Sequence, residues 1–201
     1  MMLIEETAPD QAALPVAALR DHLRLGSGFE MVADAAEARA LAGFLRAAIA
    51  TIEARTGKVL LHRRFAMRLD DWRDRLGQAL PLAPVLAVEE VQIEDGEGGV
   101  VTVPDTEWRL VADAQRPVLA PVGVILPSVP RRGAVVVRFT AGFGDSWDQV
   151  PADLAQAVLM LAARYYEDRS FEGSAAAMPF GVSALIEKWR AVRTLAGRGR
   201  A

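Results

Sequence analysis

The chain has 201 residues, of which 52% are hydrophobic, and a formal net charge of −3 at pH 7. This length and apolar content can form the core of one domain, or of a helical body with a small appended module. The acidic balance argues against general nucleic-acid binding, and the absence of cysteine excludes disulfides and thiolate metal sites. The two histidines, His22 and His62, leave little material for imidazole chemistry or for a metal site.

The sequence contains no signal for membrane insertion or secretion. No apolar run approaches the roughly 18 residues that are needed to span a bilayer. The first residues, Met1–Glu6, lack the basic region of a secretory signal. We therefore expect no membrane contact and a protein that works in the cytoplasm.

Two helices are predicted in the first sixty residues. A short one is predicted over 15–25, between a proline and a glycine. A longer one is predicted over 34–57, because Asp34 and Glu37 have the spacing of a capping box and Gly57 is a natural C-terminal stop. The apolar positions of the longer helix recur at helical spacing and are Leu41, Leu45, Ala48, Ile49 and Ile52.

Between residues 59 and 148, short apolar runs alternate with turn residues and predict a small antiparallel β module. Val85–Val88 and Val91–Ile93 lead into the glycine-rich segment Asp95–Gly99, after which Val100–Val103 resumes the apolar pattern. This arrangement is typical of a β-hairpin with a glycine-rich tip. Further strands are predicted at Trp108–Val111, Val118–Leu126 and Ala134–Thr140.

Helical patterns return towards the C-terminus. A helix is predicted over 151–169, and besides its main apolar stripe it carries Leu159 and Met160 as a second apolar face, which a neighbouring subunit could cover. Residues 170–181 have the composition of a linker, and an amphipathic helix is predicted over 182–200. The apolar face of this last helix consists of Val182, Leu185, Ile186, Trp189, Val192 and Ala196.

These elements predict an α+β fold. The N-terminal helices and the long helix near 151–169 are expected to form a helical core, with the small antiparallel β module inserted between them and the C-terminal amphipathic helix appended. The expected parts are an N-terminal helical part at 1–58, the inserted β module at 59–148, a core helix at 149–170, and a linker with a C-terminal docking helix at 171–201.

No group of residues predicts catalysis, a cofactor or a metal. Asp70-Asp71 and Glu89-Glu90 are carboxylate pairs, but adjacent residues of a strand point to opposite faces, so neither pair converges on one substrate atom without a bend. Asp95–Gly99 lacks the ligand spacing of a calcium loop and the Lys-Ser/Thr of a phosphate loop. We predict that the chain is not an enzyme. The alternative is a small cytoplasmic enzyme or regulatory domain with an unrecognised site.

Five short motifs follow one another along residues 14–170. They are Leu14-Pro15 leading to Leu23-Arg24; Thr56-Gly57-Lys58 at a helix end; Leu80-Pro81 with Pro84-Val85 before a strand; Val137 to Gly144 with Ala141-Gly142-Phe143 at a strand end; and Val150-Pro151 to Tyr166-Glu167 with Arg169 around a long helix. In this order they resemble the head–tail connector, or adaptor, family of tailed phages and phage-like gene transfer agents. One departure is Leu126-Pro127, where many members carry Trp-Pro.

The resemblance implies a ring of identical subunits, typically twelve, that binds beneath the portal protein. Such a ring extends the DNA channel, lets packaged DNA pass without specific binding, and receives the next neck protein, the stopper. It implies no cofactor, and a place in the neck of a virion or phage-like particle assembled in the bacterial cytoplasm. A stopper or a tail terminator is the near alternative, although those proteins are usually more β-rich and lack the bracketing helices.

The C-terminal helix is the predicted docking element. An amphipathic helix behind a linker can lie on its own core or in the groove of a partner, and tryptophan and arginine are enriched at interface hot spots. Adaptor C-termini commonly reach into the portal, so the resemblance favours docking. The predicted portal-binding residues are Leu185, Ile186, Trp189, Arg190, Arg193, Arg198 and Arg200, and the predicted inter-subunit residues are Leu159 and Met160.

Overall fold

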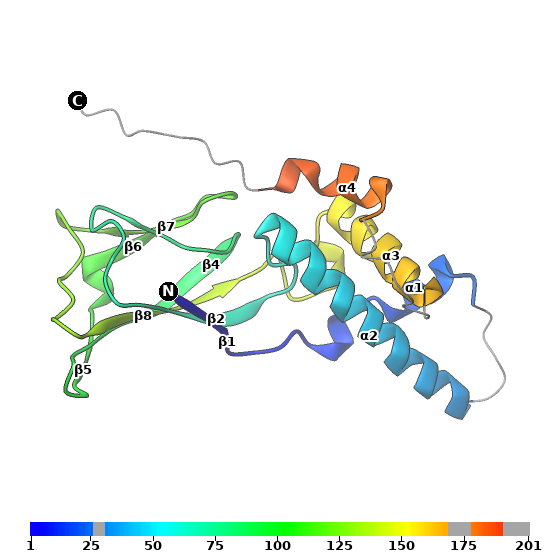
Figure 1. Ribbon diagram of the computed structural model, residues 1–201, viewed down its shortest axis with the longest axis horizontal. Helices are drawn as coiled ribbons and strands as arrows, with labels where there is room; N and C mark the ends of the chain where they lie inside the picture. The colour runs from blue at the N-terminus through cyan, green and yellow to red at the C-terminus, as the bar shows by residue number, and fades with distance from the viewer. Residues whose placement is uncertain (26–30, 169–177, 191–201) are drawn as a thin grey trace.

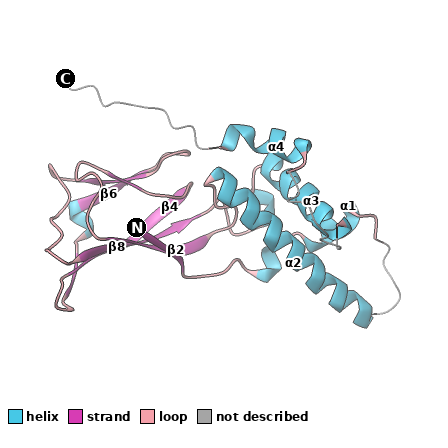
Figure 2. Cartoon of the chain, viewed as in Figure 1, coloured by secondary structure: helices cyan, strands magenta, loops and turns pink. Residues whose placement is uncertain are grey.

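The computed structural model describes residues 1–25, 31–168 and 178–190. The helices gather at one end of the molecule and the strands at the other (Figures 1 and 2), which confirms the predicted α+β class. The α-helices are α1 (Val16–His22), α2 (Met31–Thr56), α3 (Ala152–Glu167) and α4 (Phe180–Ile186), with short 3-10 turns at Gln11–Ala13, Asp105–Glu107, Trp147–Gln149 and Glu187–Trp189. None of the helices in the described part of the chain is long and apolar enough to cross a membrane.

The long helix α2 begins earlier than predicted and ends where predicted. It starts at Met31, so Asp34 lies inside it and the predicted capping box is wrong. The Glu37 carboxylate instead accepts a hydrogen bond of 2.7 Å from the Arg20 guanidinium of α1. The predicted stop is confirmed, because Gly57 has φ +68°, a left-handed conformation that ends a helix at low cost in glycine.

The β module contains two antiparallel sheets. Five strands form the larger sheet in the order β1-β2-β8-β4-β5, and three form the smaller one in the order β3-β7-β6. The larger sheet consists of β1 (Met2–Glu5), β2 (Arg63–Leu69), β8 (Ala134–Ala141), β4 (Val85–Glu94) and β5 (Val100–Thr102), and the smaller one of β3 (Gln78–Ala79), β7 (Val118–Pro121) and β6 (Trp108–Val111).

The predicted hairpin between β4 and β5 is confirmed. The Asp95 carboxylate accepts hydrogen bonds from the backbone N–H groups of Glu97 at 2.9 Å and Gly99 at 2.7 Å, and Gly98 has φ +96°. These backbone hydrogen bonds lower the pKa of Asp95. One strand is shorter than predicted, because β7 ends at Pro121 and the chain bends over residues 122–125.

Two separate clusters of apolar side chains form the interior. In the helical body, residues from α1, α2, α3 and α4 surround Leu41, Leu45 and Leu154, all 0% exposed. In the β module, the inner faces of both sheets enclose Phe139 and Leu119, also 0% exposed, and the Phe139 ring stacks on Phe65 with centroids 5.8 Å apart. The chain therefore has one core for its helices and another for its strands.

The C-terminal helix differs from its prediction in length. It begins at Phe180, inside the predicted linker, and tightens into a 3-10 turn before Arg190 adopts an extended conformation with ψ 136°. The predicted uninterrupted helix over 182–200 is therefore wrong at Arg190. Residues 169–177 of the predicted linker and residues 191–201 of the predicted helix lie outside the described residues.

Candidate interaction surfaces

The contact between α3 and α4 covers part of the second apolar face of α3. Val182 and Ile186 of α4 are buried in the helical core, and Leu159 and Met160 of α3 are half-buried against it. A Cβ atom added at Gly181 would lie 2.8 Å from Met160 Cε, so α4 approaches Met160 closely. We expected a neighbouring subunit to cover this second apolar face. The α4 helix of the same subunit covers part of it.

Polar bonds hold the end of α4 against the start of α3. The Trp189 indole N–H donates to the Asp153 carboxylate at 2.7 Å, and Lys188 Nζ lies 2.8 Å from the same carboxylate. Burial would raise the pKa of Asp153, but the hydrogen bonds from Lys188, Trp189 and the Leu154 N–H together lower it. The Trp189 ring also meets Phe143 edge to face at 5.6 Å. The tryptophan side chain is therefore engaged within its own subunit.

The predicted portal-binding residues consequently fall into three groups. Leu185, Ile186 and Trp189 pack against the helical core of their own subunit. Arg190 is exposed and forms an ion pair of 3.2 Å with Glu187. The remaining three, Arg193, Arg198 and Arg200, lie outside the described residues.

A nearly buried ion pair joins the helical body to the β module. The Arg63 guanidinium of β2, 7% exposed, donates to both carboxylate oxygens of Glu53 of α2 and, at 3.0 Å, to Glu5 of β1. Glu53 also accepts the backbone N–H of Leu60 at 2.8 Å. Burial raises the pKa of Glu53 even though Arg63 acts in the opposite direction. The pair ties the end of α2 to the first two strands.

The Thr56-Gly57-Lys58 motif strengthens the same junction. The Thr56 hydroxyl donates to the Ile52 carbonyl at 2.8 Å while Gly57 ends the helix. The Lys58 side chain, 1% exposed, then reaches into the β module, where Nζ donates to the Ala114 carbonyl and to Gln115 Oε1. Burial lowers the pKa of Lys58, and Asp113 opposes that effect. The motif has a structural role between the two bodies.

The outer face of the larger sheet carries paired charges. Arg64 contacts Glu89, Arg68 contacts Glu94, and Arg138 contacts both Glu90 and Glu6. The register of β4 shifts between Val88 and Glu90, and this bulge lets Glu89 and Glu90 bind arginines of one face. The expectation that these neighbours point to opposite faces excepted a bend in the strand, and the bulge supplies one. The pair forms salt bridges on a partly exposed surface.

Several apolar side chains stay exposed on the β module. The two edge strands of the larger sheet carry one group, and the loop after β7 carries another together with Leu76. The edge residues are Met1, Met2, Leu3 and Ile4 on the β1 side and Val100 and Val101 on the β5 side, and the loop residues are Val122, Val124 and Ile125. Sequence reasoning missed the β1 edge, because neither β1 nor β2 was predicted. The alternation of Phe65, Met67 and Leu69 is the signal that could have revealed β2.

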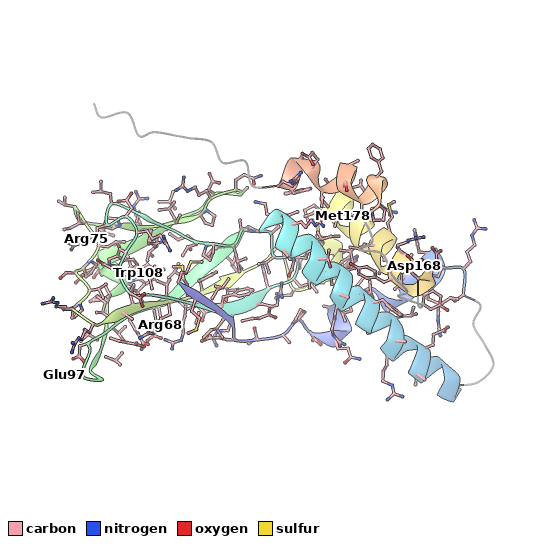
Figure 3. The ribbon with its side chains drawn as sticks, in the orientation of Figure 1. Arg68, Arg75, Glu97, Trp108, Asp168 and Met178 are labelled. Atoms are coloured by element: carbon pink, nitrogen blue, oxygen red, sulfur yellow. The ribbon has the colours of Figure 1, made fainter. Side chains whose placement is uncertain are left out.

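Figure 3 places labelled residues of the β module and of the helical body at opposite ends of the molecule. Glu97, at the tip of the β4–β5 hairpin, and Arg75 lie at the β end of the molecule, whereas Asp168 and Met178 lie at the helical end. Among the residues that the structure describes, no three histidine, aspartate or glutamate side chains are grouped so as to hold a metal ion. The features that stand out are surfaces suited to protein contacts.

No protein-family model and no curated protein matches the chain significantly. Solved structures, in contrast, match 98% of the chain. A chain in the neck of an empty gene transfer agent particle, computed with C6 symmetry, is 53% identical, with 98% of this chain and 100% of that chain covered and a TM-score of 0.88.

Two further structures give the same result. A chain in the virion of a native gene transfer agent particle is 51% identical, with a TM-score of 0.84, and one in the neck of a native particle computed with C12 symmetry is 49% identical, with a TM-score of 0.82. Both matches cover 98% of this chain and 100% of the other. The relatives are structural parts of a particle and not enzymes, which agrees with the role predicted from the sequence. The chain belongs to the family of structural neck proteins of gene transfer agent particles.

Proposed function

We propose that this neck protein is the head–tail adaptor, which forms a twelve-membered ring beneath the portal, extends the DNA channel and provides the platform for the next neck protein. The observation that carries the proposal is the match over 98% of the chain to a neck computed with C12 symmetry. The order of motifs over residues 14–170 supports the adaptor role over that of a stopper or a tail terminator, as do the helices that bracket the β module.

Attachment to the portal depends on the C-terminal segment in this proposal. Leu185, Ile186 and Trp189 fix α4 on the helical body, which gives the segment that follows a defined starting point. Arg190, Arg193, Arg198 and Arg200 then present guanidinium groups to the portal. Arginine suits such a contact because its planar fork binds carboxylates in a bidentate manner.

Passage of DNA through the ring needs a wall that does not hold phosphates. The chain has a net charge of −3, and the sheet arginines Arg64, Arg68 and Arg138 each contact a glutamate. A guanidinium already paired with a carboxylate attracts phosphate less strongly. The isolated protein is therefore expected to bind DNA weakly and without sequence preference.

The test of the proposal uses two variants that spare α4. Removing 182–200 would expose the α3 surface that Val182 and Ile186 cover, so a loss of attachment could reflect damage to the core. A chain that stops after Arg190, and a triple variant Arg193→Ala, Arg198→Ala, Arg200→Ala, avoid that problem. The matched control is Arg109→Ala, Arg116→Ala, Arg131→Ala, which removes the same charge from exposed positions of the β module.

Both C-terminal variants are expected to fold, to lose co-purification with the portal, and to leave DNA-filled heads without tails. The control triple variant should co-purify normally. Tailed particles at normal yield from both C-terminal variants would contradict the proposed attachment. A wild-type chain that co-purifies with a neighbouring neck protein but never with the portal would contradict the adaptor role and favour the stopper.

A further inference from the structure

The two outermost strands of the larger sheet lie on opposite sides of it. Among the residues that the structure describes, β1 pairs only with β2 and β5 only with β4, so each has one row of backbone N–H and C=O groups without a partner strand. Exposed apolar side chains line both edges. Met2 and Ile4 on β1 are 51% and 45% exposed, and Val100 and Val101 on β5 are 54% and 67% exposed.

Such edges are unusual for a protein that remains monomeric. Soluble proteins protect edge strands with charged side chains, prolines or bulges, because an open apolar edge pairs readily with another strand. Here β5 consists of Val100, Val101 and Thr102, with no charge. The one charged residue of β1, Glu5, is bound to Arg63 at 3.0 Å. Both edges are therefore suited to accept a strand.

Ring symmetry requires two different contact patches on each subunit. A ring with more than two subunits needs a heterologous interface, in which one patch of a subunit meets a different patch of the next. The necks that contain this chain's relatives were computed with C6 and C12 symmetry. A sheet with one open apolar edge on each side supplies two different patches of matching chemistry.

We propose that β5 of one copy pairs with β1 of the next copy, so that the five-stranded sheets of neighbouring subunits join around the ring. The partner is a second copy of this chain, and main-chain hydrogen bonds provide the recognition, as in other cases of strand addition. The proposal rests on the ring of the proposed function but assigns the surfaces that close it. Because each strand is short, this pairing forms only one of the contacts in the ring. Closure of the ring stabilises it further.

The absence of cysteine allows a direct test. A double variant, Ile4→Cys with Val101→Cys, replaces wild-type protein in cells, and purified particles are treated with a short bis-maleimide, which tolerates a shift in register. The double variant should give a ladder of multimers under denaturing conditions. Each single variant should stay monomeric, because a heterologous contact places Ile4 beside Val101 and not beside another Ile4.

The matched control pair is Val124→Cys with Phe180→Cys. These two side chains are 84% and 88% exposed, more than those on the edges, but they lie outside both edge strands. The control pair should give no ladder. A ladder of equal yield from this pair would overturn the proposal, since exposed cysteines would then react without strand pairing.

Three results with the edge cysteines would also overturn it. A double variant that stays monomeric in particles containing the ring would show that the edges do not meet. Dimers from Ile4→Cys alone would show a two-fold pairing of β1 strands. Cross-links to a different neck protein would assign the edge to another partner.

A second measurement uses the wild-type chain and does not depend on assembly of a variant. Backbone amides within 2–5 and 100–102 should exchange with deuterium at least tenfold more slowly in purified particles than in the isolated protein. Equal exchange rates at either edge would overturn the proposal. A cross-linked ring that does not touch the portal would refute the adaptor role and leave the edge pairing intact. A portal-bound ring without the ladder would refute the edge pairing and leave the adaptor role intact.

Discussion

The helical body and the β module differ in how far one subunit buries their apolar side chains. In the helical body, α4 lies over α3 and buries Val182 and Ile186, so the chain covers its own helices. In the β module, the inner sheet faces are filled, but both edges of the larger sheet expose apolar side chains such as Ile4 and Val101. The helical body covers most of its apolar side chains within the monomer, whereas the β module leaves the two edges of its larger sheet open, and we propose that other copies of the chain cover them. This difference is what the proposed pairing of β5 with β1 of the next copy predicts.

Nearly buried side chains connect the helical body to the β module. Glu53 and Arg63 connect the end of α2 to β2, and Lys58 connects it to the loop near Gln115. Because these groups are nearly buried, the bonds are screened little by water. The two bodies should therefore move together when the ring forms.

The largest effect is expected from the core of the β module. Phe139→Ala removes a fully buried ring that stacks on Phe65, and the cavity should lower the free energy of unfolding by about 4 kcal/mol. Phe180→Ala is the matched control, because that ring is 88% exposed and its loss should change the stability by less than about 0.5 kcal/mol. Urea unfolding of both variants measures the difference. Equal stabilities would show that the β module has no core of its own.

Cutting the junction should have the next largest effect. Glu53→Ala leaves the nearly buried Arg63 with Glu5 as its remaining ion-pair partner and removes the acceptor of the Leu60 N–H, which should cost about 3 kcal/mol. The control is Arg164→Ala, which breaks an exposed pair with Asp168 and should cost less than about 0.5 kcal/mol. Thermal unfolding that splits into two transitions in Glu53→Ala would show that the pair couples the two bodies. A shift no larger than that of the control would contradict the role of the junction.

The comparison of the helical body with the β module also shows which elements the sequence could predict. Helix periodicity located α2, α3 and residues 182–186 of α4, because each buries one stripe of side chains at regular spacing. The β4–β5 hairpin was predictable because its turn is a local arrangement around Asp95 and Gly98. Local patterns thus determined the elements whose stabilising contacts are close in sequence.

The missed features depend on contacts between distant residues. β1 becomes a strand only through pairing with β2, more than fifty residues later, as Leu3 opposite Met67 illustrates. The bond between Trp189 and Asp153 was not predicted, because it joins two helical segments that no local pattern links. The exposed edges could not be recognised until the strand order was known.

A smaller loss of stability is expected when the contact that anchors α4 is changed. Trp189→Phe keeps an aromatic ring beside Phe143 but loses the indole hydrogen bond to Asp153, so the free energy of unfolding should fall by about 1 kcal/mol near neutral pH. The pKa of Asp153 is depressed in the folded protein, so this contribution is present above the ordinary carboxyl pKa of 3.8 and is lost as the pH falls through the depressed value. Stability curves of the variant and the wild type should therefore converge in acid. A difference that stays constant down to the lowest pH would contradict the assignment.

The smallest predicted change is a stabilisation on the outside of the helical body. Gly43 lies within α2 and a Cβ atom there would meet nothing within 4 Å, so Gly43→Ala should raise the free energy of unfolding by up to about 1 kcal/mol. Gly57→Ala should have the opposite sign and cost about 1 kcal/mol, because φ at Gly57 is +68°. Thermal denaturation distinguishes the two. The same sign for both would show that backbone conformation does not govern these positions.

The most direct test of the central claim is a cryo-electron microscopy reconstruction of the neck of particles assembled with this chain. The account predicts a twelve-membered ring of the chain directly against the portal, with the C-terminal segment in contact with it and the β5 edge of each subunit beside the β1 edge of the next. A reconstruction in which the chain lies elsewhere in the neck, separated from the portal by another protein, would contradict the adaptor assignment.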